Sequence, residues 1–255
     1  MFAAVEFPPI ENIVEWPTWF GSGALAFNKI AFMGFIAFIL PVLLFLIASS
    51  KYKTRLVPKG IQNVVESSVD FVEKQIILPT IGPDGMGYLP LLLSMFLFIF
   101  IGNLFEIIPT AHMPANARMA NPLVLALITY VVFIGAGLKH NGPKYFVSAL
   151  FPPGVPKALY VLVTPIELIS TFLVRPFSLA VRLFANMLAG HILLITFSVL
   201  TISLVGGGIL AIISPFSFGM LVAFTGFEFM VAFLQAYIFT LLTGVYIGGA
   251  IHPAH

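Results

Sequence analysis

The chain has no cysteine and few charged residues, and both absences narrow what it can be. Without cysteine, its 255 residues can form neither disulfides nor thiolate metal sites. Charged residues make up only 9% of the chain, whereas soluble domains carry about 25%. With 60% hydrophobic residues and a mean hydropathy of +1.07, the composition excludes a soluble globular domain. The net charge of +2 gives no sign of a nucleic-acid partner, and we expect none.

Long apolar runs predict an all-α polytopic membrane protein with about five transmembrane helices, forming one transmembrane domain over 1–255. About 20 apolar residues suffice for one crossing. Three runs have that length, and two later runs are much longer. A segment after the first run has apolar residues at helical spacing, which indicates an amphipathic surface helix, with an ordinary loop helix as the alternative. The expected segments are an N-terminal segment (1–23), three spans (24–49, 89–108 and 122–138), the amphipathic helix (60–75) and two long regions (158–205 and 210–251).

The two long regions exceed what a simple span needs. At 1.5 Å per residue, 40 helical residues reach about 60 Å, roughly twice the hydrocarbon thickness. Each region therefore either breaks into two spans or forms one strongly tilted helix. Pro165 and Pro176 are candidate breaks, but no polar connector accompanies them. We expect two long, tilted helices that form an antiparallel hairpin turning near residues 206–208.

Basic residues predict the orientation of the chain. Lysine and arginine concentrate in cytoplasmic loops of membrane proteins. Two loops carry most of them, and only Lys29 and Arg118 fall on the opposite side. The residues of the two basic loops are Lys51, Lys53, Arg55, Lys59, Lys139, Lys144 and Lys157. We therefore expect an external N-terminus and cytoplasmic basic loops. No basic segment precedes an apolar run at the start, so we expect no cleaved signal peptide.

Arg182 is the most informative single residue. The run from Ala158 to Val205 carries only three charged residues, and Arg182 lies near its middle. An arginine at the centre of a membrane helix costs roughly 2.5–3.5 kcal/mol even on insertion scales, and its guanidinium stays charged. Such a residue indicates a polar path or a buried anion, and hence ion translocation.

Other scarce polar residues match Arg182 in depth if the long regions form a hairpin. Residues at one level of an antiparallel hairpin have a nearly constant sum of positions, which pairs Arg182 with Gln235 and His191 with Glu228. Asn186 follows Arg182 by four residues and extends the same helix face. A histidine beside a carboxylate in a membrane is a plausible proton relay. The alternative is a satisfied pair that only joins two helices.

Three more charged residues permit two readings each. Glu106 lies near the end of its span and, taken alone, is more simply read as a solvated helix end. Arg175 and Glu167 are eight residues apart, toward the start of the first long region. They form either an interfacial pair or two side chains that reach from the helix toward the membrane surface.

Three motifs carry a resemblance to a known family. The stretch from Pro176 to His191, PFSLAVRLFANMLAGH, closely resembles the signature of subunit a of bacterial F-type ATP synthases. The stretch LQAYIFTLLT, from Leu234 to Thr243, resembles the matching motif of that family's last helix. GNLFEIIP, from Gly102 to Pro109, resembles an earlier span. The similarity covers most of the chain in motif order and span layout.

The resemblance implies a proton-translocating stator subunit in a bacterial plasma membrane, without a catalytic site, metal or cofactor of its own. In this family the subunit stands beside a rotating ring of c subunits, each with a carboxyl group in mid-membrane. Two offset half-channels reach the ring from opposite sides. The implied partners are the c-ring, the peripheral-stalk b subunit, the remaining ATP synthase subunits and the lipid bilayer.

Roles for individual residues follow from the same resemblance. Arg182 would match the essential arginine, which favours ionisation of the ring carboxyl and blocks direct leak between half-channels. The outer half-channel would comprise Asn103, Glu106, Asn186, His191, Glu228 and Gln235. The cytoplasmic half-channel would comprise Glu167, Arg175 and Ser178. Some members carry the acid where His191 stands and the histidine where Glu228 stands. The exchange favours a coupled pair and leaves open which member first accepts the proton.

Rival functions fit the sequence less well. An ion-coupled secondary transporter is the alternative, but such proteins usually show two related halves with broken helices, and no internal repeat is visible. An intramembrane enzyme would need a nucleophile with a base, or a metal motif, and neither His-Glu-x-x-His nor Gly-x-Ser-x-Gly occurs. A purely structural role for the subunit would not explain why a charged arginine stands in the middle of a membrane helix at position 182.

Overall fold

The computed structural model describes residues 19–21, 27–52, 59–108, 116, 118–151, 159–205 and 208–252. Within these ranges the chain is helical apart from turns and a single antiparallel bridge between Phe20 and Phe27. The candidate membrane spans are Lys29–Ser50, Pro83–Ile107, Ala120–Asn141, Tyr160–Val205 and Ala211–Ile251. The all-α class, the five spans and the long C-terminal helices are thus confirmed. Most of the expected N-terminal segment, and residues 206 and 207 of the expected turn, lie outside the described residues.

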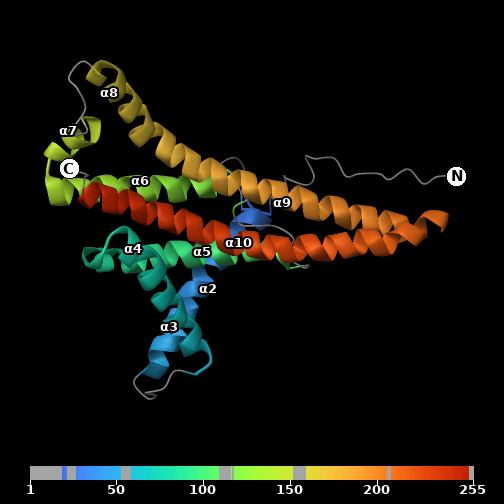
Figure 1. The fold of residues 1–255 in the computed structure, drawn as a ribbon. Helices are drawn as coiled ribbons and strands as arrows, with labels where there is room; N and C mark the ends of the chain where they lie inside the picture. Colours follow the sequence, from blue (N-terminus) through green and yellow to red (C-terminus); the bar gives the residue numbers. More distant parts are fainter. Residues whose placement is uncertain are drawn as a thin grey trace.

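The helices follow one another as Figure 1 shows. In order they are α2 (Lys29–Tyr52), α3 (Ile61–Val72), the π-helix η2 (Glu73–Ile77), α4 (Leu78–Thr80), the 3₁₀ helix η3 (Pro83–Tyr88), α5 (Leu89–Ile107), α6 (Ala120–Asn141), α7 (Lys144–Leu150), α8 (Tyr160–Ile169), the π-helix η5 (Ser170–Val174), α9 (Arg175–Val205), the 3₁₀ helix η6 (Gly208–Ile213) and α10 (Ser214–Ile251).

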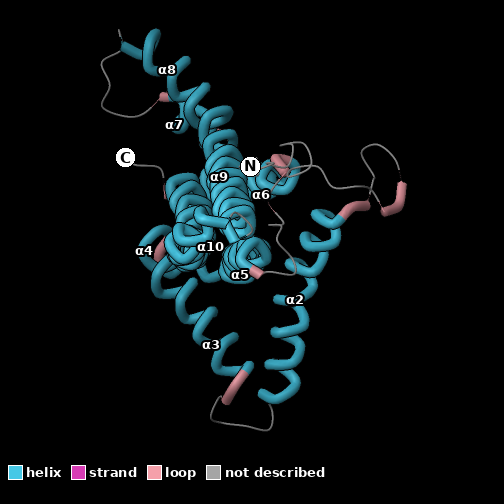
Figure 2. Tube along the Cα trace, turned by 90° about the vertical axis from the view of Figure 1, so that its right-hand side faces the viewer, coloured by secondary structure: helices cyan, strands magenta, loops and turns pink. Residues whose placement is uncertain are grey.

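Two directions dominate the arrangement. The long helices α9 and α10 form an antiparallel hairpin, and α5 and α6 lie alongside it (Figure 1). Helix α2 runs steeply across them, so that in Figure 2 the hairpin is seen end-on while α2 and α3 are seen from the side. The two directions cannot both follow the membrane normal. The 38 residues of α10 extend about 57 Å against a hydrocarbon core of about 30 Å, so α10 is much longer than a perpendicular crossing of the membrane needs.

Local sequence signals account for where the helices begin and end. The Asn28 side chain caps α2, because its Oδ1 accepts a hydrogen bond of 3.0 Å from the backbone N–H of Ala31. Helix α6 ends at Gly142, whose φ of 61° lies in the left-handed region that glycine adopts without strain. Pro215 stands in the first turn of α10, where its missing N–H leaves no hydrogen bond unmade.

Proline also explains the two π-helical segments. Each ends two residues before a proline: η2 ends at Ile77, before Pro79, and η5 ends at Val174, before Pro176. A proline inside a helix removes one hydrogen bond and collides with the carbonyl four residues earlier, and widening the preceding turn relieves that collision. Neither Pro165 nor Pro176 breaks the long region, which runs as one helical path from residue 160 to residue 205.

The buried face of α9 is set by helical spacing. Leu179, Ala180, Leu183 and Met187 are all at most 1% exposed, and they recur along one face of the helix. This face packs against α6 and α10, which contribute Phe133 and other large buried side chains to the same core. The remaining face of α9, which includes position 182, is therefore left outside the core.

One end of α10 is held by very close backbone packing. A Cβ atom placed on Gly248 would collide with the backbone carbonyl oxygen of Thr80 in α4. From the other side, Asn141 Nδ2 at the end of α6 donates hydrogen bonds to the carbonyls of Ala250, at 2.8 Å, and Ile251, at 3.2 Å. These carbonyls belong to the last turn of α10, where no intrahelical donor remains. The glycine and the asparagine together fix how far α10 extends along its neighbours.

Gly248→Val should therefore destabilise the protein strongly. The added side chain meets backbone atoms that cannot move aside, and overpacking of this kind costs about 1–3 kcal/mol or more. The measurement is the thermal unfolding midpoint of the purified protein in detergent. Gly249→Val is the matched control, because a Cβ there meets no atom within 4 Å. Equal effects of the two substitutions would contradict the explanation, since helix propensity alone would then account for both.

Candidate functional site

Arg182 lines an open cavity between α9 and α10. The cavity has a volume of about 490 Å³. Its lining residues are Arg182, Ala185, Asn186 and Ala189 from α9, and Val231, Leu234 and Gln235 from α10. The Arg182 side chain is exposed, and among the described residues no hydrogen bond or ion pair reaches it. A permanent cation thus faces an open space, and the described part of the chain supplies no counter-ion.

The cavity exists because small residues surround the arginine. Ala185 and Ala189 lie three and seven residues after Arg182, on the face of α9 next to the buried one. Larger side chains at those two positions would fill the cavity. On α10, Gln235 lies opposite Arg182, as the hairpin arithmetic predicts, and is only 5% exposed. Its Nε2 has no hydrogen-bond partner in the described structure, so an amide donor remains free beside the guanidinium.

A second polar level lies farther along the hairpin, where α9 and α10 approach closely. A Cβ on Gly190 would stand 2.6 Å from the Glu228 carboxylate, so this carboxylate rests directly on the backbone of α9. The neighbouring His191 is also buried, at 4% exposure. The hairpin arithmetic placed His191 and Glu228 at one depth, and the structure agrees to within one residue. Glu228 Oε2 has no hydrogen-bond partner among the described residues.

Helix α5 brings further polar groups to this level. Asn103 and Glu106 lie three residues apart on one face of α5, and both are buried. Asn116, from the connection between α5 and α6, donates a 2.8 Å hydrogen bond from Nδ2 to Asn103 Oδ1. Glu106 and Glu228 are close enough for their charges to interact. Glu106 is therefore not a solvated helix end, because it belongs to a buried cluster built from three parts of the chain.

Asn116 is a site residue that sequence reasoning missed. It is fully buried, although it lies outside any helix. No periodicity marks a residue in a connection, and asparagine is common in turns. Its only sequence signal is its place shortly after the motif that contains Asn103 and Glu106. The contact of Asn116 with Asn103 of α5 is visible only in the three-dimensional structure.

The site differs from the rest of the bundle in how its polar atoms are satisfied. Several intramembrane hydroxyls donate to a carbonyl of their own helix, as Thr196, Thr240 and Thr243 do. The buried side-chain atoms without a partner, among the described residues, belong to Asn103, Glu106, Asn116, Thr164, Glu228 and Gln235. All of these except Thr164 belong to the two polar levels. Unpartnered polar atoms in a membrane interior indicate water or a passing ion.

The third expected group lies apart from both levels. Arg175 places its guanidinium 5.4 Å from the centre of the Tyr246 ring, a cation–π contact between α9 and α10. Glu167 accepts a long hydrogen bond of 3.5 Å from Thr171 and forms no salt bridge with Arg175. Ser178 is exposed on α9, four residues before Arg182. The structure therefore does not join Glu167 and Arg175 as an ion pair.

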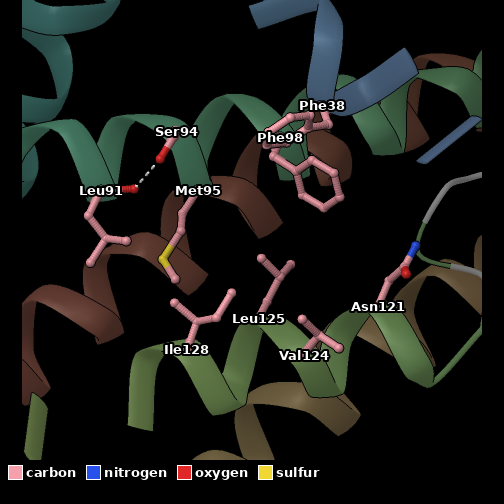
Figure 3. A pocket seen from close by; sticks show the side chains of 9 residues that line it. All are labelled: Phe38, Leu91, Ser94, Met95, Phe98, Asn121, Val124, Leu125 and Ile128. Carbon is pink, nitrogen blue, oxygen red and sulfur yellow. Dashed lines mark hydrogen bonds between the residues drawn. The ribbon is translucent and has the colours of Figure 1, made fainter. Parts of the chain in front are cut away.

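Two other pockets are apolar. Figure 3 shows one of about 300 Å³ between α2, α5 and α6, where Phe38, Phe98 and Met95 surround a space with Asn121 at one end. The other, of about 560 Å³, lies between α2, α3 and α5. No ionisable side chain lines either pocket. Among the described residues, no three histidine, aspartate or glutamate side chains gather as a metal site would require. The chemistry of the chain is thus concentrated at the hairpin.

A multi-span helical protein whose helical hairpin carries an exposed arginine at one level and a buried histidine and glutamate at another has the arrangement typical of membrane proteins that move ions. Comparison with known proteins narrows this class. The family model described as ATP synthase A chain matches residues 31–248. The chain belongs to this family, ATP synthase subunit a.

Relatives support the assignment over nearly the whole length. The ATP synthase subunit a of Frankia alni is 44% identical over 259 aligned positions, which cover 97% of this chain and 87% of the relative. That of Rhodococcus erythropolis is 41% identical, covering 98% and 92%. That of Beijerinckia indica is 37% identical, covering 96% and 94%.

Proposed function

We propose that this chain is the proton-translocating stator subunit of a bacterial F-type ATP synthase, with no catalytic site of its own. Membership of the subunit a family supports the role, and the cavity at Arg182 carries the residue-level part of the proposal. An exposed, unpartnered guanidinium in a membrane helix needs an anion from elsewhere. A carboxylate on a neighbouring ring of c subunits is an anion that could enter this cavity from the membrane side.

Arg182 acts as a fixed positive charge at the point where ring carboxyl groups pass. Its charge stabilises the carboxylate over the carboxylic acid, so an arriving carboxyl group releases its proton there. The same charge repels a free proton that would cross directly between the two half-channels. Lysine would serve less well, because a buried lysine can lose its charge whereas arginine keeps it.

The outer half-channel follows the two polar levels. Protons from the side of the N-terminus reach the buried cluster at Glu106 and Asn103, and then the pair His191 and Glu228. Both Glu228 and His191 can hold and release a proton. From there the path leads along the hairpin to the ring. Gln235 and Asn186, which line the cavity with Arg182, supply amide groups at its inner end.

The cytoplasmic half-channel begins at the opposite end of α9, with Arg175, Glu167 and Ser178. These residues lie before Arg182 in α9 and α8, whereas His191 lies after it, so the two half-channels are offset along the tilted hairpin. The offset obliges a proton to travel with the ring between release and uptake. In this orientation the N-terminus is external and the basic loops are cytoplasmic. The peripheral-stalk b subunit and the other ATP synthase subunits complete the assembly.

Disulfide cross-linking tests whether the cavity faces a ring. The chain has no cysteine, so one introduced cysteine reports one position. Ala189→Cys, in the cavity wall, is expected to form a disulfide with a cysteine placed beside the mid-membrane carboxyl of a c subunit, because such bonds need Cβ atoms within about 4.5 Å. Leu43→Cys is the control: this residue is 46% exposed on α2, which packs on α5 away from the hairpin (Figure 2). A cross-link to the ring from Leu43→Cys, together with none from Ala189→Cys, would contradict the proposal.

A further inference from the structure

We infer that Asn116 is a positioning residue of the outer half-channel, which holds one ordered water molecule between itself, Asn103 and Glu106. The inference rests on the proposed function for its setting, and on the buried cluster for its geometry. Asn116 is fully buried, as is Asn103, and Glu106 is 2% exposed. Buried amides and carboxyl groups in native proteins are hydrogen-bonded almost without exception, either to protein or to water.

The unpartnered atoms of this cluster match the capacity of one water molecule. The hydrogen bond from Asn116 Nδ2 to Asn103 Oδ1 leaves a donor, Asn103 Nδ2, and two acceptors, Asn116 Oδ1 and Glu106 Oε1. A water molecule can accept from the first and donate to the other two, and buried waters typically make about three hydrogen bonds. If both amides were turned over, one amide donor and one amide acceptor would still remain, so the match does not depend on their assignment.

The hydrogen bond also decides which way the Asn103 amide faces. Because Asn116 occupies Asn103 Oδ1, the N–H groups of Asn103 remain as donors for the water. The water is then oriented with its hydrogens toward the acceptor at Glu106. Asn116 thus acts through Asn103 and the water rather than on the proton itself. It is itself held at α5 by its hydrogen bond to Asn103, and it gives an incoming proton a preformed acceptor beside Glu106.

The test replaces Asn116 by leucine, which has the same branching at Cγ and is larger, but has no hydrogen-bonding group. Inverted vesicles stripped of the catalytic sector are energised with a potassium gradient and valinomycin, so that protons flow from the lumen through the membrane sector. In assembled complexes, Asn116→Leu should reduce this flow about tenfold, the loss expected for one buried hydrogen bond in a polar relay. Delivery of protons to the ring then limits the rate, so the lumenal pH at which proton flow is half-maximal becomes more acidic. Asn116→Gln keeps the amide and should retain most of the flow.

Controls separate this role from simple packing. Asn141→Leu removes another asparagine whose amide donates a hydrogen bond, in this case to the carbonyl of Ala250 at the C-terminal end of α10. This substitution should leave the lumenal pH of half-maximal proton flow unchanged. If leucine prevents assembly, Asn116→Asp, which keeps the shape but cannot donate as a carboxylate, tests the same hydrogen bond. Equal losses in the leucine and glutamine variants, or wild-type flow in the leucine variant, would overturn the inference. If Arg182→Ala still blocks pumping in that case, the proposed function stands and only the role of Asn116 falls.

Discussion

Arg182→Ala is expected to abolish ATP-driven acidification of inverted vesicles while leaving the complex assembled. Among the described residues Arg182 makes no hydrogen bond or ion pair, so its removal breaks no polar interaction within that part of the chain. What disappears is the charge facing the cavity. Removing one preorganised electrostatic group typically lowers a rate by 10²–10³, and we expect at least roughly a hundredfold loss of pumping here. Arg182→Lys should also fail, since a lysine in this setting can lose its proton.

The measurement needs assembly checked on the same vesicles, by the amount of this subunit and of ring subunits in the purified complex. Arg118→Ala is a suitable control, because Arg118 is exposed just before α6 and is distant in sequence from the residues that line the cavity. It should pump at the wild-type rate. Near-normal acidification by assembled Arg182→Ala would mean that the arginine is a structural charge, and the mechanism proposed above would be wrong.

Glu228→Gln is expected to reduce pumping by about a hundredfold, a usual loss when a proton-transfer group is removed. The Glu228 carboxylate rests on Gly190 and lies at the level of His191, so the two ionisable groups share one place in the path. If they work as a pair, their order across the hairpin matters less than their joint presence. The exchange His191→Glu with Glu228→His should then pump at least about tenfold better than either single substitution, a difference of about 1.4 kcal/mol in the activation barrier.

The four proteins, wild type included, are compared by the same acidification assay at equal amounts of assembled complex. A doubly exchanged protein whose loss of pumping equals the product of the two single losses would show that the two residues act independently. Normal pumping by Glu228→Gln would remove Glu228 from the path altogether. Either result leaves the Arg182 prediction untouched, because the two polar levels are separated by seven residues of α10, about 10 Å.

The contents of the site could be predicted from sequence where they depend on helical geometry. Rise and periodicity are the same in every α-helix, so an antiparallel hairpin brings Arg182 to the level of Gln235 whatever the surrounding packing. The structure indeed places both residues in one cavity. The same reasoning placed His191 near Glu228. In each case the prediction required only that the two long apolar regions be single helices lying side by side.

Relations between separate helices could not be predicted in this way. The proximity of Glu106 to Glu228 depends on how α5 packs on α10, and hydrophobic patterning does not specify a crossing angle. Asn116 lies in a connection, where the chain has no repeating geometry to extrapolate. The steep angle between α2 and the hairpin likewise does not follow from apolar runs considered one at a time (Figure 1). These features follow from tertiary contacts and not from local propensity.

The π-helical segment before Pro176 determines how the two ends of the long helix are rotated relative to each other. A π turn takes up about one more residue than an α turn, and each residue of an α-helix corresponds to about 100° of rotation. The faces of α8 and α9 are therefore out of phase with those of an uninterrupted helix. An uninterrupted α-helix would place Arg175 about 80° around the axis from Glu167, because eight residues exceed two full turns by that angle. The extra residue of the π segment removes about 100° of this rotation, so the acid and the guanidinium lie about two turns apart on nearly the same side of the helix, where no salt bridge joins them. One residue in a widened turn thus sets the angle between the charges before and after it.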